Sequence, residues 1–300
     1  MEEKFVEING VSTKIITFGR WIDDSLGNTN RLILFIPGNP GMIGFYKKFA
    51  ETLHDKTNIP VWCVGHAGHN YGEQTETQLP KFNEHPDLYG LRGQVQHKID
   101  FFRKYISEDT KVYLVGHSIG SYMALEMLDD PYVKSTLRNA YFLFPTIEHM
   151  AVTSNGKFLN TLVRPIVPLI LFLTWVYTIL PTFLANAILY IYMMISNIPW
   201  ELHSENIREL LKPGLLKRVF FLAFEEMDQV KERNDRLLRE NITIIKLYYG
   251  ENDKWAPREY FNKIREDLLD VNAELCNIDH TFIFHNSATV ARTLAYWILP

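Results

Sequence analysis

The sequence predicts an α/β fold in which a mostly parallel central sheet is flanked by helices on both faces. Short runs rich in Val, Ile, Leu, Phe and Tyr alternate along the chain with longer stretches of helical spacing. A nearly continuous apolar run is typical of a strand buried on both faces, and the alternation indicates βαβ units. The length of 300 residues suits one domain, 1–300, with a helical cap or insertion expected at 150–240.

The expected elements follow from these two patterns. Apolar runs of strand length lie at 14–18, 32–36, 61–64, 112–115, 140–144, 243–249 and 273–278. Helical patterns lie between them, at 45–56, 91–106, 121–128, 225–239, 258–267 and 289–297. In a sheet of this kind, chemistry collects where the parallel strands end, so the polar residues that follow the strands are the candidates for a functional site.

Composition excludes some classes of function. The net charge is −4 and no long basic run occurs, which argues against a nucleic-acid partner. The first residues are charged and lack the apolar region of a signal peptide, so we expect a protein that faces the cytosol.

A G-x-S-x-G pentapeptide follows the apolar run 112–115 and precedes the expected helix 121–128. It reads Gly116-His117-Ser118-Ile119-Gly120. A strand, a sharp turn and a helix form the nucleophile elbow, in which a Cβ at either glycine would clash and the serine hydroxyl stands at the tip. Ser118 is therefore the candidate nucleophile.

An acid and a base follow two later strands, in the chain order of α/β-hydrolases. Gly250-Glu251-Asn252-Asp253 follows one strand and Asp279-His280 follows the next. We assign Asp253 as the acid, with Glu251 as its rival, and His280 as the base that takes the serine proton. The rival base is His285, whose aromatic neighbours are typical of a core histidine.

The loop Pro37-Gly38-Asn39-Pro40-Gly41 and the residue after the nucleophile are the expected oxyanion donors. Ile119 offers one backbone N–H, and Asn39 offers the other because Pro40 has none. His117 receives no role.

No metal or cofactor is expected from the sequence. His66 and His69 follow the strand 61–64, but no carboxylate or third histidine lies near them in sequence. We expect His66 to be a residue of the site's rim or a structural hydrogen bonder.

The segment 165–200 contains no Asp, Glu, Lys, Arg or His. Its first apolar arm, 169–180, is about 18 Å long as a helix, and its second, 182–198, lies at the lower limit for a membrane span. Pro181 separates the arms, and Trp175, Tyr177 and Trp200 suit an interface. These features favour a hairpin that enters one leaflet of a lipid layer; the other reading is the buried lid of a soluble hydrolase.

Several stretches spread over the chain together resemble the lipid-droplet-associated hydrolases, a family within the α/β-hydrolases. They are 35–41 (FIPGNPG), 64–69 (VGHAGH), 88–91 (LYGL), 94–98 (QVQHK), 116–122 (GHSIGSY), 144–147 (FPTI) and 248–250 (YYG). The resemblance implies a serine hydrolase of lipid esters, with sterol esters proposed, on the cytosolic surface of lipid droplets and the endoplasmic reticulum. It places Ser118, Asp253 and His280 at the family's motif positions.

Two functions follow from the sequence. The first is a serine lipid hydrolase that acts on a neutral lipid ester, with the segment 165–200 on the droplet monolayer. The second is a droplet-surface scaffold that clusters droplets with little hydrolysis. A thioesterase or an acyltransferase would use the same three residues, and the sequence gives no oligomeric state.

Overall fold

The computed structural model describes residues 1–24, 30–70 and 79–299, which form a mostly parallel sheet of eight strands flanked by helices. The α/β-hydrolase fold that the sequence predicts is confirmed. The strands lie in the order β1-β2-β4-β3-β5-β6-β7-β8. They are β1 (Glu2–Ile8), β2 (Val11–Phe18), β3 (Arg31–Ile36), β4 (Val61–Val64), β5 (Lys111–His117), β6 (Leu137–Leu143), β7 (Ile245–Gly250) and β8 (Asn272–Cys276).

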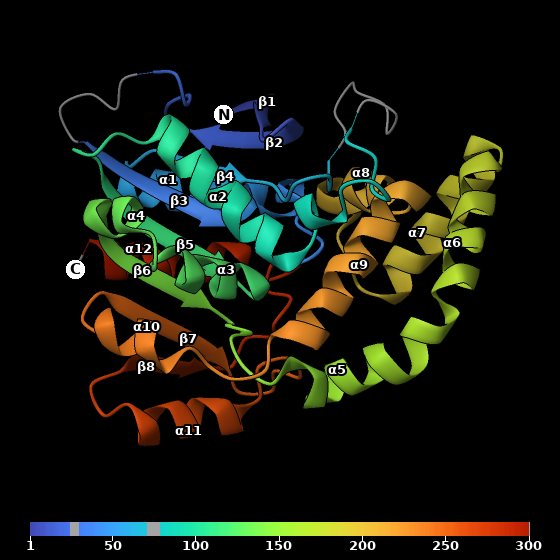
Figure 1. Cartoon of the computed structure of the whole chain (residues 1–300). Helices are drawn as coiled ribbons and strands as arrows, with labels where there is room; N and C mark the ends of the chain where they lie inside the picture. The colour runs from blue at the N-terminus through green and yellow to red at the C-terminus, as the bar shows by residue number, and fades with distance from the viewer. Residues whose placement is uncertain (25–29, 71–78, 300) are drawn as a thin grey trace.

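Helices cover both faces of this sheet and form a cap at one end of it (Figure 1). The described helices are η2 (Ile43–Tyr46), α1 (Lys47–Thr57), η4 (Pro86–Leu88), α2 (Leu91–Tyr105), α3 (Ile119–Met127), α4 (Pro131–Thr136), η5 (Met150–Val152), α5 (Ser154–Phe158), η6 (Leu159–Val163), α6 (Arg164–Ile179), α7 (Thr182–Ile195), α8 (Trp200–Leu210), α9 (Pro213–Gln229), α10 (Asp235–Glu240), α11 (Arg258–Asp267) and α12 (Ser287–Ile298).

Strands β3 to β8 run parallel, and β1 and β2 pair antiparallel at one edge. The sequence did not predict β1. Asn9 and Gly10 join it to β2, and both have positive φ, as a two-residue hairpin turn requires. Strand β1 does not read as an apolar run, because charged residues lie on its exposed face. The signal that could have found it is the Asn-Gly pair, which favours a hairpin turn.

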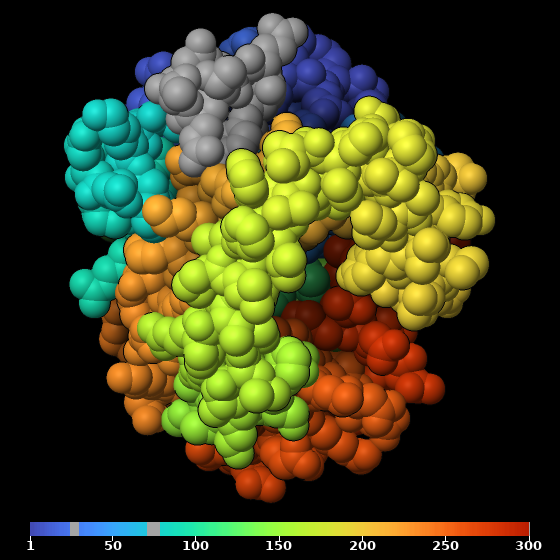
Figure 2. Space-filling model, turned by 90° about the vertical axis from the view of Figure 1, so that its right-hand side faces the viewer, coloured from blue at the N-terminus to red at the C-terminus, as the bar shows by residue number. Residues whose placement is uncertain are grey.

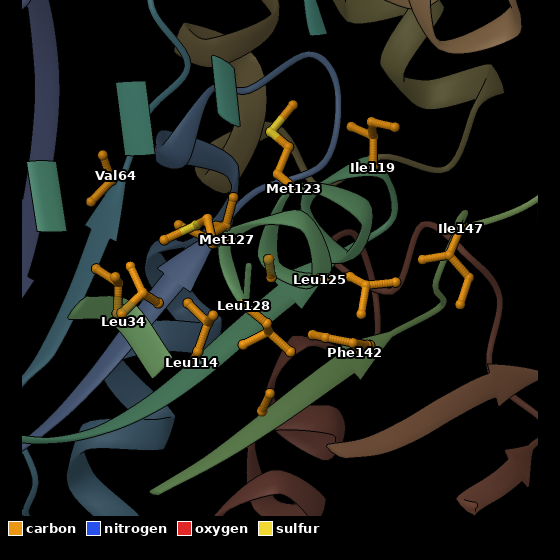
Figure 3. Packing of buried hydrophobic residues seen from close by; sticks show 14 of the residues in the cluster. Leu34, Val64, Leu114, Ile119, Met123, Leu125, Met127, Leu128, Phe142 and Ile147 are labelled. Carbon is orange, nitrogen blue, oxygen red and sulfur yellow. The ribbon is translucent and has the colours of Figure 1, made fainter. Parts of the chain in front are cut away.

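Alternate residues of each central strand enter two separate cores. Leu32, Leu34 and Ile36 of β3 pack in the core that also contains α2, α3, α10 and α11. Ile33 and Phe35 pack on the other face, in the core that contains α1 and α12. Figure 3 shows the first core from close by, with side chains of α3 resting on β3, β5 and β6. Burial on both faces explains why these strands read as continuous apolar runs.

The helical patterns are mostly correct, but the expected helix 225–239 is wrong. Helix α9 begins at Pro213 and ends at Gln229, and a separate helix, α10, begins at Asp235. The Asn234 side chain accepts from the N–H of Leu237 and so starts α10 as its N-cap. Helix α10 packs against α3 beside the sheet, and we use the word cap for the helices η5 to α9.

The first apolar arm is longer than the sequence suggested. Helix continues from Ser154 to Ile179 through one π-helical turn at η6, with Pro168 inside α6. By length and composition this helix could cross a membrane, and only 6% of its most apolar window is buried. The break at Leu180 and Pro181 is where it was expected, and α7 begins directly after it (Figure 1).

Candidate active site

Ser118 stands in the turn between β5 and α3, at the end of the sheet that faces the cap. Its φ of 54° and ψ of −125° are strained for a residue with a side chain. The Ser118 N–H donates to Leu143 O of β6, 3.0 Å away, which fixes the turn to the neighbouring strand. This is the backbone conformation of a nucleophile elbow.

The two glycines of the pentapeptide are required by their surroundings. A Cβ on Gly116 would lie 2.5 Å from Gly120 O, and one on Gly120 would lie 2.4 Å from Ile36 O. No side chain fits at either distance, so the turn and the end of β3 pack backbone against backbone. This close approach brings the loop after β3 beside Ser118.

A chain of hydrogen bonds joins the three side chains that the sequence singled out. His280 Nε2 lies 2.9 Å from Ser118 Oγ, and His280 Nδ1 lies 2.7 Å from Asp253 Oδ2. The other carboxylate oxygen, Asp253 Oδ1, accepts from the N–H groups of Trp255 at 2.7 Å and Ala256 at 3.1 Å. The Asp253 side chain is fully buried and His280 is 12% exposed. Three strand ends, those of β5, β7 and β8, therefore bring residues far apart in sequence to one point.

The rival residues lie elsewhere. Glu251 is exposed and its carboxylate pairs with Arg258 at 2.8 Å. His285 is also exposed, so its reading as a core histidine is wrong, and it does not line the cavity that contains Ser118.

Three hydrogen bonds hold the loop 37–41 in place. The N–H of Gly38 donates to Tyr46 Oη at 3.1 Å. Asn39 Nδ2 donates to Val219 O at 3.1 Å and to Glu226 Oε1 at 2.9 Å, both on α9. The Asn39–Pro40 peptide is cis. Core and cap together thus fix the loop that contains the expected donor N–H of Asn39.

His117 has a structural connection that the sequence did not reveal. Tyr46 Oη lies 2.7 Å from His117 Nδ1, and His117 Nε2 lies 3.1 Å from the backbone O of His280. Burial holds the pKa of His117 well below its usual value, so the ring is neutral, with its proton on Nε2. Tyr46 accepts from Gly38 and donates to His117, which donates to His280. This relay joins the loop 37–41 to the loop that carries His280.

The other two histidines considered in the sequence are buried behind the same loop. His69 Nδ1 lies 2.6 Å from Pro40 O, and burial lowers the pKa of His69 to about 3. His66 is neither at the rim of the cavity nor hydrogen-bonded through its ring to any residue the structure describes, so both expectations for it are wrong. In the described ranges 1–24, 30–70 and 79–299, no group of three metal-ligating side chains gathers.

Ser118 and His280 open into a cavity of about 390 Å³ between the sheet and the cap. Most of its wall is apolar and comes from the cap helices and the segments that join them. The lining side chains from this part are Met150, Leu159, Tyr192, Ile198, Ile207, Leu210, Leu216, Val219, Phe220 and Ala223. Among the described residues, Glu226 is the one carboxyl in this wall, and burial raises its pKa to about 8.

Comparison with known proteins places this geometry in a family. Residues 29–283 match the family of lipid-droplet associated hydrolases. The chain belongs to this family. Its relatives include the lipid droplet-associated hydrolases of Drosophila melanogaster and Homo sapiens. The first is 34% identical over 97% of this chain and 96% of the relative, and the second is 34% identical over 98% and 94%.

Solved structures similar to this lipid droplet-associated hydrolase family member share its fold at low sequence identity. An esterase from Thermogutta terrifontis superposes with a TM-score of 0.61 at 15% identity and covers 99% of this chain and 98% of its own. A bromoperoxidase from Bacillus anthracis gives 0.62 at 13%, covering 99% of each chain. Family and fold together support a hydrolase.

Sequence patterns did not identify Tyr46, His117 or Glu226 as residues of the site. The expected helix 225–239 contained Glu226, but no local pattern relates it to Asn39, which is 187 positions away. Only the position of His117 could have indicated its place in the site, because it precedes the nucleophile and ends a buried strand.

Proposed function

We propose that this chain is a serine hydrolase that cleaves carboxylic esters of apolar lipids. In this proposal Ser118 is the nucleophile, His280 the general base and Asp253 the acid that orients it. The observation that carries the proposal is the continuous Asp253–His280–Ser118 hydrogen-bonded chain, which ends in a mostly apolar cavity. A hydroxyl next to an imidazole that a carboxylate orients is the arrangement that acyl transfer needs.

The reaction follows from these positions. Ser118 Oγ attacks the ester carbonyl while its proton moves to His280 Nε2, and Asp253 stabilises the imidazolium through Nδ1–H. The N–H groups of Ile119 and Asn39 bind the oxyanion of the tetrahedral intermediate. This intermediate collapses to an acyl-enzyme as His280 returns the proton to the departing alcohol. Water, deprotonated by His280, then releases the carboxylic acid and restores Ser118.

The cavity supports an apolar substrate. Its volume of about 390 Å³ lies within the range of about 300–1,000 Å³ typical of small-molecule sites. Its wall offers few polar groups away from Ser118, so binding would come from apolar contact. Sterol esters, the class that the family resemblance implies, have the apolar acyl chain that such a wall accepts.

The segment 165–200 supports binding to a lipid surface. Most large apolar side chains that are exposed in the described residues lie on α6 and α7, where a soluble monomer would not leave them. They include Leu169, Phe172, Leu173, Trp175, Phe183, Ile188, Ile191 and Ile195.

A hairpin fits this surface better than a span. Arg164, at the start of α6, pairs with Asp228 of α9 through two hydrogen bonds, at 3.0 and 2.7 Å, and so ties that end to the cap. The continuous helix Ser154–Ile179 is long enough for a span, but only its last sixteen residues, those of α6, run from this tie to Ile179. They are about 24 Å long, less than the hydrocarbon core of about 30 Å. We propose that the hairpin lies in a lipid droplet monolayer or the cytosolic leaflet of the endoplasmic reticulum. The relatives named lipid droplet-associated hydrolases support this location.

The cavity opens on the same side as these arms. Figure 2 shows the molecule hollowed between α6 and the region of α7. Parts of the chain from the sheet's side of the cavity are visible deep inside this hollow. Leu159 of η6 and Tyr192 of α7 both line the cavity. Docking of the arms on lipid would therefore present the opening to the oil, and an apolar ester could enter without crossing water.

The test is labelling by a fluorophosphonate probe together with a panel of lipid esters on emulsions. Wild-type protein should label and should hydrolyse an apolar ester, and Ser118→Ala should lose both. Ser135→Ala, a change at an exposed serine of α4, is the matched control and should behave as wild type. Labelling that persists in Ser118→Ala would contradict the nucleophile. Thioester substrates and added alcohol acceptors in the same assay separate a thioesterase or an acyltransferase from an esterase.

A further inference from the structure

Glu226 is a buried carboxyl that the hydrolytic mechanism above does not use. It is 4% exposed and lines the cavity beside Asn39 and Ser118. The nearby acids of α9 have other partners, because Glu225 accepts from Gln229 and Asp228 binds Arg164. Glu226 therefore points into the site, while these two acids bond to other cap residues.

The Asn39 amide gives both of its hydrogens to one face of α9. Val219 O and Glu226 Oε1 are seven positions apart, about two turns of helix, and accept at 3.1 and 2.9 Å. Two acceptors in fixed positions define the orientation of an amide plane. Because Asn39 is also the expected oxyanion donor, its own side chain links that backbone N–H to the cap.

The charge state of Glu226 suits this place. Burial raises its pKa to about 8, although the Asn39 hydrogen bond opposes the shift, so the carboxyl is mostly neutral at pH 7. A neutral acid still accepts through its carbonyl oxygen. It also keeps a second negative charge away from the oxyanion that would form at Ser118.

We propose that Glu226 is a positioning residue that acts through the Asn39 side chain to aim the Asn39 N–H at the oxyanion. This inference rests on the proposed function, because an oxyanion forms only if Ser118 attacks a carbonyl. It makes helix α9 of the cap part of the catalytic apparatus and not only a wall of the substrate cavity.

The experiment compares Glu226→Gln and Glu226→Leu with the same two changes at Glu225. The readouts are kcat and KM on a soluble short-chain 4-nitrophenyl ester. Loss of an oxyanion donor costs about 10²–10³ in kcat, and a misaligned donor costs less, so Glu226→Leu should lower kcat about tenfold or more with KM nearly unchanged. Glu226→Gln keeps a carbonyl acceptor for Asn39 and should restore most of kcat. Both Glu225 variants should match wild type.

A second background tests whether the effect passes through Asn39. Asn39→Ala keeps the backbone N–H but removes the amide that Glu226 holds, and it should lower kcat to a similar extent. Glu226→Leu added to Asn39→Ala should then cost nothing further, because coupled residues are not additive. If Glu226→Leu does not fold, Asn39→Ala alone decides, and an unchanged kcat there overturns the proposal.

The outcomes separate this proposal from the one it rests on. Wild-type protein that neither labels with fluorophosphonate nor hydrolyses esters contradicts the proposed function. Active wild-type protein with an equally active Glu226→Leu contradicts only the role of Glu226. A Glu226→Gln variant with a kcat as low as that of Glu226→Leu also contradicts this role. So does a double variant of Asn39→Ala and Glu226→Leu whose loss in kcat is the product of the two single losses.

Discussion

The central sheet and the arms α6 and α7 have similarly apolar sequences but opposite burial. Phe142 on β6 is fully buried between two helical layers, whereas Phe183 on α7 is 71% exposed. The strands bury their side chains because helices from both sides of the sheet meet them. The arms contact the protein on one side, and on their other side many of their large apolar side chains stay exposed in the part of the chain that the structure describes. An apolar run in the sequence therefore indicates burial against some apolar surface. In the sheet that surface is the rest of the chain, and for the arms we propose that it is lipid.

The largest expected effect separates chemistry from lipid binding. Ser118→Ala should reduce ester hydrolysis by on the order of 10⁴-fold or more, because the hydroxyl that forms the acyl-enzyme is lost. The same variant should float with lipid droplets as wild type does, since the arms are unchanged. The measurement is turnover on an emulsion together with flotation. Droplet clustering that persists undiminished in Ser118→Ala would favour the scaffold function over hydrolysis.

The next effect tests the difference in burial directly. Phe142→Ala should lower the free energy of unfolding by about 3–5 kcal/mol, because it leaves a cavity in the core. Phe183→Ala should change it by about 0.5 kcal/mol or less in the absence of lipid, because the ring is already exposed. Urea titration of both variants gives the comparison. A large loss in Phe183→Ala without lipid would mean that the arms pack as a protein core.

A smaller effect tests the relay that runs from the loop 37–41 to His280. Tyr46→Phe removes the hydroxyl that accepts from Gly38 and donates to His117. Two buried partners then lose a hydrogen bond, at a cost of about 1–3 kcal/mol, and kcat should fall about tenfold. Tyr105→Phe, on α2, is a control outside the cavity. Equal kcat in Tyr46→Phe and wild type would remove the relay from the account.

The last effect is spread over several pH units and concerns the buried acid of the cap. Folding raises the pKa of Glu226 from about 4.5 to about 8, so this group's contribution to stability is complete below pH 4.5 and is lost as pH rises to about 8. Glu226→Gln does not titrate and should gain on wild type across that window, by at most about 1.4 kcal/mol per pH unit. Urea midpoints at several pH values measure the difference. Parallel curves for the two proteins would contradict the buried, neutral state of Glu226.

The sequence predicted the part of the molecule that depends on local pattern. Strands such as β3 and β5 and the turn at Ser118 follow from consecutive residues, and the order of Asp253 and His280 along the chain follows from where strands end. The bond between Asn39 and Glu226 does not, because it joins segments 187 positions apart. The length of the first arm was also underestimated, because the helix begins at Ser154, outside the uncharged segment 165–200, and continues past Pro168 to Ile179.

The most direct measurement of the central claim, that the sheet carries the chemistry and the arms carry access to lipid, uses two substrates and one variant. Phe172→Asp with Ile191→Asp places a charge on each exposed arm. We predict that this variant hydrolyses a soluble short-chain ester as wild type does and hydrolyses an emulsified long-chain ester about a hundredfold less well, since two buried apolar contacts with lipid are lost. Equal activity on the emulsion, or an equal loss on both substrates, would contradict the account.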